Sequence, residues 1–244
     1  MAQKKLQRFN ELHTFPNVLE KPEGMAGKWN TFFKNNNSII LELACGKGEY
    51  TVGLAAMHPK NNYIGIDIKG NRMWAGAKIA LENNYSNAGF LRTHIDKIEN
   101  YFEPDEVTEI WITFPDPQLR RSRAKKRLTH PAYLKLYHNI LKKNGIVHLK
   151  TDSPDLYIFT KEVLAFYQLE IVDQTADVYE HGENPISELN IKTHYEKLDI
   201  AKSSKIFYLK FKLTDVISDK EKSKLFNEYY KTLETPEADE SKTD

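Results

Sequence analysis

From Ser38 to Leu213 the chain alternates short apolar runs with longer amphipathic stretches, and this alternation limits the folds that it can adopt. Seven runs have strand character, and several are apolar at every position, as expected for strands covered on both faces. They are Ile39–Leu43, Tyr63–Ile68, Ala88–Thr93, Glu109–Phe114, Ile146–Lys150, Glu170–Asp177 and Lys205–Leu213. The helical stretches are Glu49–Met57, Lys69–Asn83, Pro131–Leu141 and Pro154–Gln168. This order predicts an α/β fold with a mostly parallel sheet and right-handed crossovers.

Composition divides the 244 residues into three parts. Residues 1–37 are polar and broken by prolines and glycines, so we expect an N-terminal arm with a short helix near Trp29–Lys34, or alternatively a frayed end. Residues 38–213 form the alternating domain. Residues 214–244 carry nine acids against five lysines, which predicts an acidic, partly disordered extension with one amphipathic helix around Leu225–Tyr230.

The overall composition excludes several classes of protein. Lysine and arginine total 35 and aspartate and glutamate 34, so the formal charge of +1 excludes a chain that is basic throughout but allows a local basic patch. The single cysteine, Cys45, excludes an internal disulfide or a zinc site of several thiolates, and the eight histidines lack metal spacing, so we expect no metal. No apolar run approaches the roughly 20 residues of a membrane span. Residues 1–15 lack the apolar core of a secretory signal, and we expect a location in the reducing cytoplasm.

The loop after the first strand predicts a nucleotide-type cofactor. Gly46 and Gly48 let the backbone turn sharply between strand and helix and let a ligand approach without an intervening Cβ. The second strand ends at Asp67, an acid placed to accept hydrogen bonds from both hydroxyls of a ribose. Glu42, at the end of the first strand, is unsuited to a phosphate and suits a ligand with a cationic group. These features favour S-adenosylmethionine over a dinucleotide, which would want glycine at Ala44; a structural turn without a ligand is the third alternative.

Two further residues near this loop have simple interpretations. Asp96 follows the third strand, where a carboxylate can accept a hydrogen bond from the exocyclic amine of an adenine. Asp96 is alternatively the N-cap of a helical turn over Lys97–Tyr101, and the two interpretations are compatible. Cys45 has no neighbour in sequence that would activate a thiolate, so we interpret it as a small packing residue.

A second motif follows the fourth strand, in Thr113-Phe114-Pro115-Asp116-Pro117. The two prolines stiffen the turn and present Asp116 at the carboxyl edge of the sheet. Six cations in residues 120–127 come directly after it. Such a run is often a solvated face, or an import signal in eukaryotes. Beside a cofactor edge and a fixed acid it favours a phosphate-binding strip for a polyanion, since arginines can make bidentate phosphate contacts.

Five motifs, in this order, resemble those of the bacterial tRNA (guanine-N7)-methyltransferases. They are ELACGKGEY, GID, TFPDPQLRRSRAKKRL, HLKTDS and THYE, within about residues 38–213. The resemblance implies a Rossmann-like class I methyltransferase fold, with a mostly parallel seven-stranded sheet, helices on both faces and S-adenosylmethionine as methyl donor. It implies methylation of N7 of the guanine at position 46 in the variable loop of tRNA, forming 7-methylguanosine. This chain departs from the family pattern at Ala44 for glycine, Asp67 for glutamate and Gln118-Leu119 for Trp-Pro.

The resemblance also implies roles for individual residues. The family's cofactor acids map to Glu42, Asp67, Asp96 and Asp116. Its substrate contacts map to Arg120, Asp152, Thr193, Tyr195 and Glu196. Its RNA-binding strip maps to Ser122, Arg123, Ala124, Lys125, Lys126 and Arg127. Two of these have structural alternatives: Asp152 as the cap of the helix from Pro154, and Tyr195 as an aromatic packing residue.

The implied reaction needs alignment more than proton transfer. Guanine N7 carries a lone pair and no proton, so attack on a sulfonium methyl requires orientation and tolerance of growing positive charge on the purine. Asp116 is our candidate catalytic residue, through either the N1–H and amino edge of guanine or the ammonium of the donor, and Asp152 is a second acceptor for that edge. The rival hypotheses are an adenosylmethionine enzyme acting on a small molecule and a non-catalytic RNA-binding module. The oligomeric state stays open.

Overall fold

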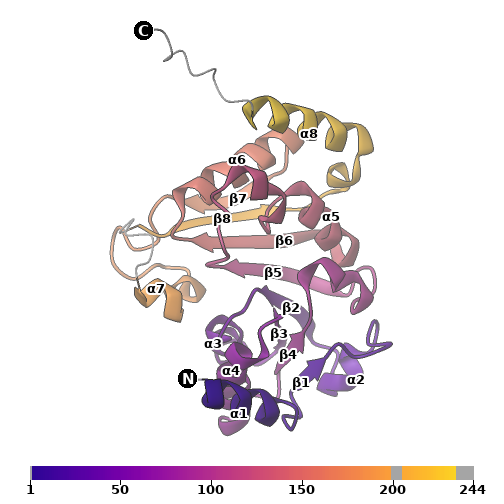
Figure 1. Ribbon diagram of the computed structural model, residues 1–244, viewed down its shortest axis with the longest axis vertical. Helices are drawn as coiled ribbons and strands as arrows, with labels where there is room; N and C mark the ends of the chain where they lie inside the picture. Colours follow the sequence, from indigo (N-terminus) through magenta and orange to yellow (C-terminus); the bar gives the residue numbers. More distant parts are fainter. Residues whose placement is uncertain (1, 199–204, 235–244) are drawn as a thin grey trace.

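Eight strands form one sheet in the computed structural model, which describes residues 2–198 and 205–234 (Figure 1). The strand order is β1-β4-β3-β2-β5-β6-β8-β7. Of these strands, β8 alone runs antiparallel to its neighbours, β6 and β7. The bounds are β1 Val18–Glu20, β2 Ser38–Leu43, β3 Asn61–Asp67, β4 Ala88–Arg92, β5 Val107–Thr113, β6 Leu141–Thr151, β7 Ile171–Thr175 and β8 Phe207–Lys212.

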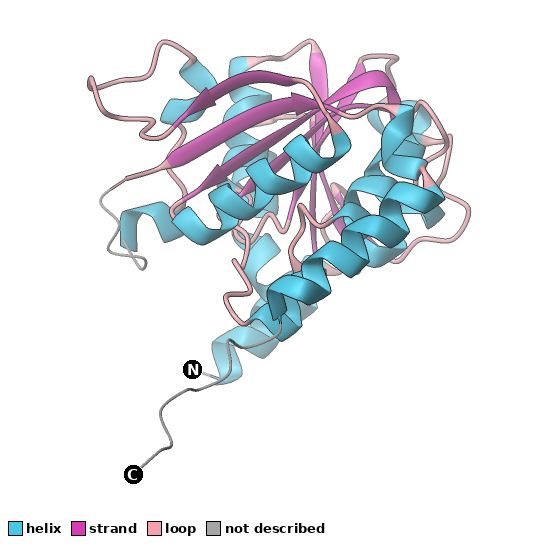
Figure 2. Ribbon diagram, turned by 90° about the horizontal axis from the view of Figure 1, so that it is seen from above, coloured by secondary structure: helices cyan, strands magenta, loops and turns pink. Residues whose placement is uncertain are grey.

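Helices lie on both faces of the sheet (Figure 2). The α-helices are α1 Ala2–Leu12, α2 Trp29–Phe33, α3 Glu49–Met57, α4 Gly70–Glu82, α5 Pro131–Ile140, α6 Pro154–Tyr167, α7 His194–Leu198 and α8 Lys220–Glu234. Short 3₁₀ helices are η1 Ile95–Asn100, η2 Arg121–Lys126, η3 Ser187–Asn190 and η4 Asp215–Ser218. The predicted α/β fold is confirmed, and α3 to α6 begin and end within one residue of the predicted bounds.

Two buried apolar clusters lie on opposite sides of the sheet. In β2, Ile39, Leu41 and Leu43 belong to one cluster and Ile40 to the other, as the two-residue period of a strand requires. The first cluster includes residues of α2, η1, α5, α6 and α8, and the second includes residues of α1, α3, α4 and η3. Because both faces are covered, the strands can be apolar throughout, as their sequences indicated.

The structure differs from the expected seven strands by the addition of β1. Val18–Glu20 pairs in parallel with Phe90–Arg92 of β4, at the edge of the sheet. Three half-buried residues give too short a pattern to be recognised in a polar segment. The helix α1 was likewise not expected from the sequence, although Leu12 at its end is completely buried.

The two outer parts of the chain pack on the central one. In the arm, the Trp29 ring stacks on Phe102 with 5.1 Å between centroids, and its Nε1 donates to the carbonyl of Tyr101 at 2.8 Å. In the extension, α8 is the helix expected around Leu225–Tyr230, and its Phe226 is buried in the first cluster. The division at residues 37 and 213 remains our proposal, and residues 235–244, where we expect disorder, lie outside the described residues.

Two searches of the described residues bear on function. None of the helices in residues 2–198 and 205–234 is long and apolar enough to cross a membrane. Within the same ranges, three or more His, Cys, Asp or Glu side chains do not gather where they could hold a metal ion.

Candidate active site

The carboxyl ends of β2, β3, β5 and β6 meet at one edge of the sheet, and the residues that follow them enclose a cavity of about 800 Å³. Its lining is Ala44, Gly46, Asp67, Lys69, Arg72, Phe114, Pro115, Asp116, Pro117, Leu119, Asp152, Ser153, Pro154 and Asp155. A second cavity of about 250 Å³ shares Ala44 and Asp67 with the first and extends to Asp96. The fold thus brings together five predicted site residues: Gly46, Asp67, Asp96, Asp116 and Asp152.

The glycine loop has a backbone that explains its composition. Gly46 and Gly48 have φ angles of +56° and +75°, in the left-handed region that glycine adopts without strain. A Cβ on Gly48 would lie 2.6 Å from the Phe90 ring, so this residue shapes the loop and does not line either cavity. Ala44 also has a positive φ, of +56°, which makes it the strained member of the turn.

Asp67 lines both cavities and is held in place by backbone donors. The Gly46 N–H donates to Asp67 Oδ2 at 3.0 Å, and the Lys69 N–H donates to Oδ1 at 2.8 Å. Each carboxylate oxygen keeps a further lone pair, because an ionised carboxylate has about four acceptor sites. Asp67 is therefore fixed in place and still able to accept two hydroxyl donors, as a ribose would supply.

Glu42 is placed differently from the other predicted cofactor acids. It is buried beneath the loop, where Oε2 accepts from the Thr51 N–H at 2.7 Å and the Thr51 hydroxyl at 2.5 Å. Its Oε1 accepts from the Thr113 hydroxyl at 2.9 Å. Glu42 does not line either cavity, so its contact with a cofactor stays a prediction. Burial raises the pKa of Glu42 to about 7, against the hydrogen bonds from both threonines, which lower it.

Replacing Glu42 by glutamine should remove a pH dependence of stability. Between the ordinary pKa of 4.5 and the folded value of about 7, the folded protein holds a proton that the unfolded chain has released. The wild type therefore loses stability as pH rises through this window, by roughly 3 kcal/mol in all at 1.36 kcal/mol per pKa unit. In thermal unfolding, the unfolding temperature of Glu42→Gln relative to that of the wild type should be higher at pH 8 than at pH 5. An equal difference at both pH values would contradict the raised pKa.

The turn that carries Asp116 is strained at both ends. Phe114 and Gln118, neither of them glycine, have φ angles of +46° and +48°. The Phe114 N–H donates to the carbonyl of Lys150 at 2.8 Å, and Asp116 Oδ1 accepts from the Gln118 N–H at 3.0 Å. These contacts hold the exposed Asp116 carboxylate in the wall of the larger cavity.

Arg127, at the end of the basic run, stabilises this turn from inside the protein. Its guanidinium donates to the carbonyls of Pro117 and Gln118, at 3.1 and 3.3 Å, and to the Tyr230 hydroxyl at 3.3 Å. It also lies 4.5 Å from the centroid of the Phe159 ring. Arg127 is only 6% exposed, so in this arrangement its guanidinium stabilises the turn that carries Asp116 and is not available to a phosphate.

The rest of the basic run, residues 120–126, has both buried and exposed side chains. Ala124 is 1% exposed and lies three residues before Arg127; a spacing of three puts two residues on the same side of a 3₁₀ turn. The predicted strip residues that face solvent are Ser122, Arg123, Lys125 and Lys126, and Arg120 before them is exposed as well. The side chain of Arg121 lies outside what the structure describes.

Arg127→Met should separate the internal role of Arg127 from phosphate binding. Loss of three part-buried hydrogen bonds from a charged group should destabilise the fold by about 1–3 kcal/mol and lower turnover through the Asp116 turn. The salt dependence of the tRNA binding that the resemblance implies should stay unchanged, whereas Arg123→Met, the exposed control, should reduce its slope by about 1. Filter binding at several salt concentrations measures both variants. A reduced slope in Arg127→Met would assign this guanidinium to a phosphate.

The capping alternative is wrong for both Asp152 and Asp96, since the N-caps of α6 and η1 are Ser153 and His94, and the ligand contacts of the two acids stay predictions. Ser153, not Asp152, caps α6: its hydroxyl accepts from the Leu156 N–H at 3.2 Å, and Asp152 lines the cavity. Asp96 lies within the first turn of η1 and lines the smaller cavity with Tyr133. Cys45 is buried, and burial raises the pKa of its thiol well above the ordinary value, as suits a packing residue.

Comparison with known proteins agrees with this arrangement. A family model described as a putative methyltransferase matches residues 36–209. The tRNA (guanine-N(7)-)-methyltransferase of Christiangramia forsetii is 45% identical over 221 residues, which cover 87% of this chain and 99% of that one. That of Porphyromonas gingivalis is 46% identical over 215 residues, covering 83% of this chain and 86% of that one. This chain belongs to the tRNA (guanine-N(7)-)-methyltransferase family.

Solved structures support the fold of this family member. A crystal structure of the 16S rRNA methyltransferase KamB superposes with a TM-score of 0.59 at 12% sequence identity, covering 81% of this chain and 99% of that one. At this identity the likeness concerns the fold alone. Together with the sheet order, it confirms the Rossmann-like methyltransferase class, with one strand more than expected.

The cavities of this family member fit S-adenosylmethionine in the chemistry of their donors and acceptors. Asp67 offers acceptors for a ribose, the Asp96 wall offers one for an adenine amine, and the loop at Gly46 leaves room for a close ligand. The two cavities share a border at Ala44 and Asp67, as a nucleoside with a side chain would require.

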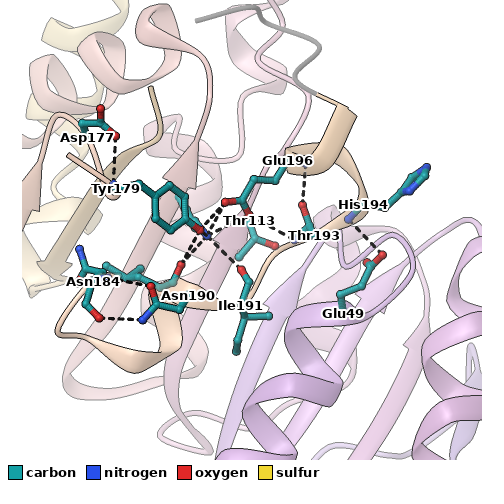
Figure 3. Close-up of polar contacts among 12 residues, drawn as sticks. Glu49, Thr113, Asp177, Tyr179, Asn184, Asn190, Ile191, Thr193, His194 and Glu196 are labelled. Carbon is teal, nitrogen blue, oxygen red and sulfur yellow. Dashed lines mark hydrogen bonds and ion pairs between the residues drawn. The ribbon is translucent and has the colours of Figure 1, made fainter. Parts of the chain in front are cut away.

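Three predicted substrate residues, Arg120, Thr193 and Glu196, do not line either cavity. The side chain of Tyr195 lies outside what the structure describes. The Glu196 N–H donates to the Thr193 hydroxyl at 3.1 Å and the Thr193 N–H donates to Glu196 Oε2 at 3.3 Å, a capping box at the start of α7 (Figure 3). Thr193 and Glu196 therefore shape their own segment in this arrangement.

Sequence reasoning missed three cations of the site. Lys69 and Arg72 line the larger cavity from the beginning of α4, far in sequence from the basic run. Their signal was their position, two and five residues after Asp67. Lys150, at the end of the apolar strand β6, is completely buried, and a charged residue in such a strand was the available signal.

Proposed function

We propose that this protein transfers the methyl group of S-adenosylmethionine to N7 of guanine in tRNA, at position 46 in the variable loop. The N7 lone pair forms the new C–N bond while the C–S bond breaks, leaving 7-methylguanosine and S-adenosylhomocysteine. The observation that carries the proposal is one cavity lined by the glycine loop, Asp67 and a rigid Asp116, with an exposed basic run directly beyond it. The relatives' name supports the choice of tRNA and guanine N7.

The donor side of the site is built from residues at the carboxyl ends of β2, β3 and β4. S-Adenosylmethionine supplies an electrophilic methyl group on its sulfonium. Asp67 accepts from the ribose hydroxyls, Asp96 accepts from the adenine amine, and Gly46 leaves room for the ligand backbone. Glu42 is proposed to attract the ammonium from beneath the loop, close to Ala44.

The acceptor side is built from the ends of β5 and β6. Asp116 and Asp152, which both line the cavity, are proposed to accept from N1–H and the amino group of the guanine. Positive charge grows on the purine during transfer, so a fixed carboxylate stabilises the transition state more than the ground state. Leu119, 63% exposed, lies with Phe114 at the apolar wall where the family's Trp-Pro pair would stand.

The basic run is proposed to bind the tRNA backbone next to the cavity. Arg120, Ser122, Arg123, Lys125 and Lys126 are exposed and follow Asp116 within ten residues. Phosphate contacts from such a run fix the register of the RNA and leave the choice of base to the cavity. With tRNA as partner, we propose that the protein acts in the cytoplasm.

Incubation with methyl-labelled S-adenosylmethionine and unmodified tRNA tests the function. Nucleoside analysis should find the label in 7-methylguanosine. A tRNA with adenine in place of the guanine at position 46 should accept no label. Label in another nucleoside, or none with tRNA but transfer to a small molecule, would refute the proposal.

A further inference from the structure

Lys150 is completely buried, and its ammonium is surrounded by acceptors from one distant segment. Nζ donates to the carbonyls of Leu189 and Ile191, at 2.7 and 3.1 Å. It lies 3.1 Å from the Tyr179 hydroxyl and forms an ion pair with Glu196 at 3.1 Å. Burial lowers the pKa of Lys150 to about 8, against Glu196, which raises it, so Lys150 is mostly an ammonium at pH 7.

Glu196 is enclosed by the same contacts. Its side chain is 6% exposed, and the Tyr179 hydroxyl donates to Oε1 at 2.5 Å while Lys150 and the Thr193 N–H approach Oε2 (Figure 3). Both oxygens of this carboxylate therefore have partners within the protein. The resemblance assigned Glu196 to the substrate, but in this structure its carboxylate forms an ion pair with Lys150.

The segment fixed in this way runs along α3 in the opposite direction. The His194 N–H donates to Glu49 Oε1 at 3.2 Å, at the start of α3 (Figure 3). Ile191 packs on Gly53, where an added Cβ would meet its side chain at 3.0 Å. At the end of the helix, His58 Nε2 lies 2.8 Å from Glu188 Oε1. Residues 188–194 therefore lie against the helix that follows the glycine loop.

On its other side, Lys150 contacts the turn that carries Asp116. Its carbonyl accepts from the Phe114 N–H at 2.8 Å, and Nζ lies 5.6 Å from the centroid of the Phe114 ring. Two residues further on, Asp152 lines the cavity. One buried residue thus connects the acceptor wall of the site to the segment of residues 188–196.

We propose that Lys150, Glu196 and Tyr179, here called the Lys150 cluster, are positioning residues for the guanine acceptor, and that Glu196 acts through this cluster without touching the base. The inference rests on the proposed function. Loosening the cluster should displace the acceptor wall at Phe114 and Asp152, while Asp67 and Asp96 keep their places. The cluster therefore predicts a loss of turnover on tRNA with little change in the affinity for S-adenosylmethionine.

Tyr179→Phe is the mildest test, because it removes one hydroxyl that bonds a charged partner. We expect kcat/KM for tRNA to fall about tenfold, and the Kd for S-adenosylmethionine to stay within twofold of the wild type. Tyr63→Phe is the matched control, since this buried tyrosine belongs to the same apolar cluster and contacts Asn61 instead. Wild-type kinetics in Tyr179→Phe, or an equal loss in Tyr63→Phe, would overturn the inference.

A double variant separates positioning from stability. Lys150→Met leaves the buried Glu196 charge unpaired and should lower the unfolding temperature sharply, whereas Lys150→Met with Glu196→Gln should recover much of it. We expect kcat/KM for tRNA to stay low in the double variant. Recovery of turnover along with the unfolding temperature would show that the cluster is merely structural.

The outcome for Glu196→Gln tests whether this residue touches the base. If the variant loses its preference for guanine while Tyr179→Phe keeps it, the carboxylate contacts the base and the inference is wrong. Failure of the wild type to form 7-methylguanosine would instead refute the proposed function, so the two failures are distinguishable. If Lys150→Met does not fold, Tyr179→Phe and Glu196→Gln still decide the matter.

Discussion

Asp116→Ala is expected to abolish methyl transfer, with a loss of about a thousandfold, while the protein still folds. The Asp116 carboxylate is exposed in the cavity wall and bonds within the protein to the Gln118 N–H. Its removal should therefore cost little stability, about 1 kcal/mol for one turn hydrogen bond. Single-turnover rates with saturating tRNA and donor measure the chemical step, and thermal unfolding measures the fold.

Asp116→Asn is the matched control, because the amide keeps the size of the side chain and can still accept from Gln118. The neutral side chain cannot stabilise positive charge on the purine, so we expect a loss nearly as large as with alanine. Near-normal single-turnover rates in either variant would remove Asp116 from catalysis and would leave Asp152 as the acid of the acceptor wall.

Changing Arg123, Lys125 and Lys126 together to alanine should weaken tRNA binding by roughly ten- to a hundredfold and flatten its salt dependence by about two to three units of slope. These side chains are exposed, and the buried Ala124 and Arg127 that anchor the run are left intact. The affinity for S-adenosylmethionine should not change. Binding measured across a salt series gives both quantities.

Lys142→Ala with Lys143→Ala provides the control for charge alone. Both lysines are exposed at the beginning of β6, at the opposite end of this strand from Asp152. They should leave the salt slope nearly unchanged. If the triple variant behaves like this control, the basic run is a solvated face and the tRNA binds elsewhere.

Periodicity predicted the elements that cover or build the sheet because burial on a regular face leaves a regular pattern. Glu49–Met57 was predicted with the bounds that α3 has, and Pro131 and Pro154 marked the first residues of α5 and α6. β1 was missed because three half-buried residues leave little pattern, and α1 was missed because most of its residues are polar, with Leu12 alone buried among residues 6–12. Their place depends on contacts with residues far along the chain, which local sequence does not encode.

The part of the candidate site that follows from strand order could be predicted from the sequence. Acids at strand ends, such as Asp67 and Asp116, fall at the cavity because parallel strands end at one edge. The basic run was harder, since sequence does not reveal which cations turn inward: Arg127 is identical in chemistry to Arg123 but points to Pro117. Lys150 and Glu196 could not be paired from sequence, because residues 176–193 before Glu196 are largely irregular.

The pairing of β1 with β4 has a consequence for the order in which the chain is made. Glu20 reaches Arg92, 72 residues later, and Leu12 packs against Gly70 at the beginning of α4. A ribosome synthesising from the N-terminus therefore releases this arm several seconds before its docking surface exists, at about 5–20 residues per second. During that interval the apolar side chains of the arm have no native partner. The arm thus waits for partners that are made after it, and once docked it covers the edge of β4, which would otherwise be open to another chain.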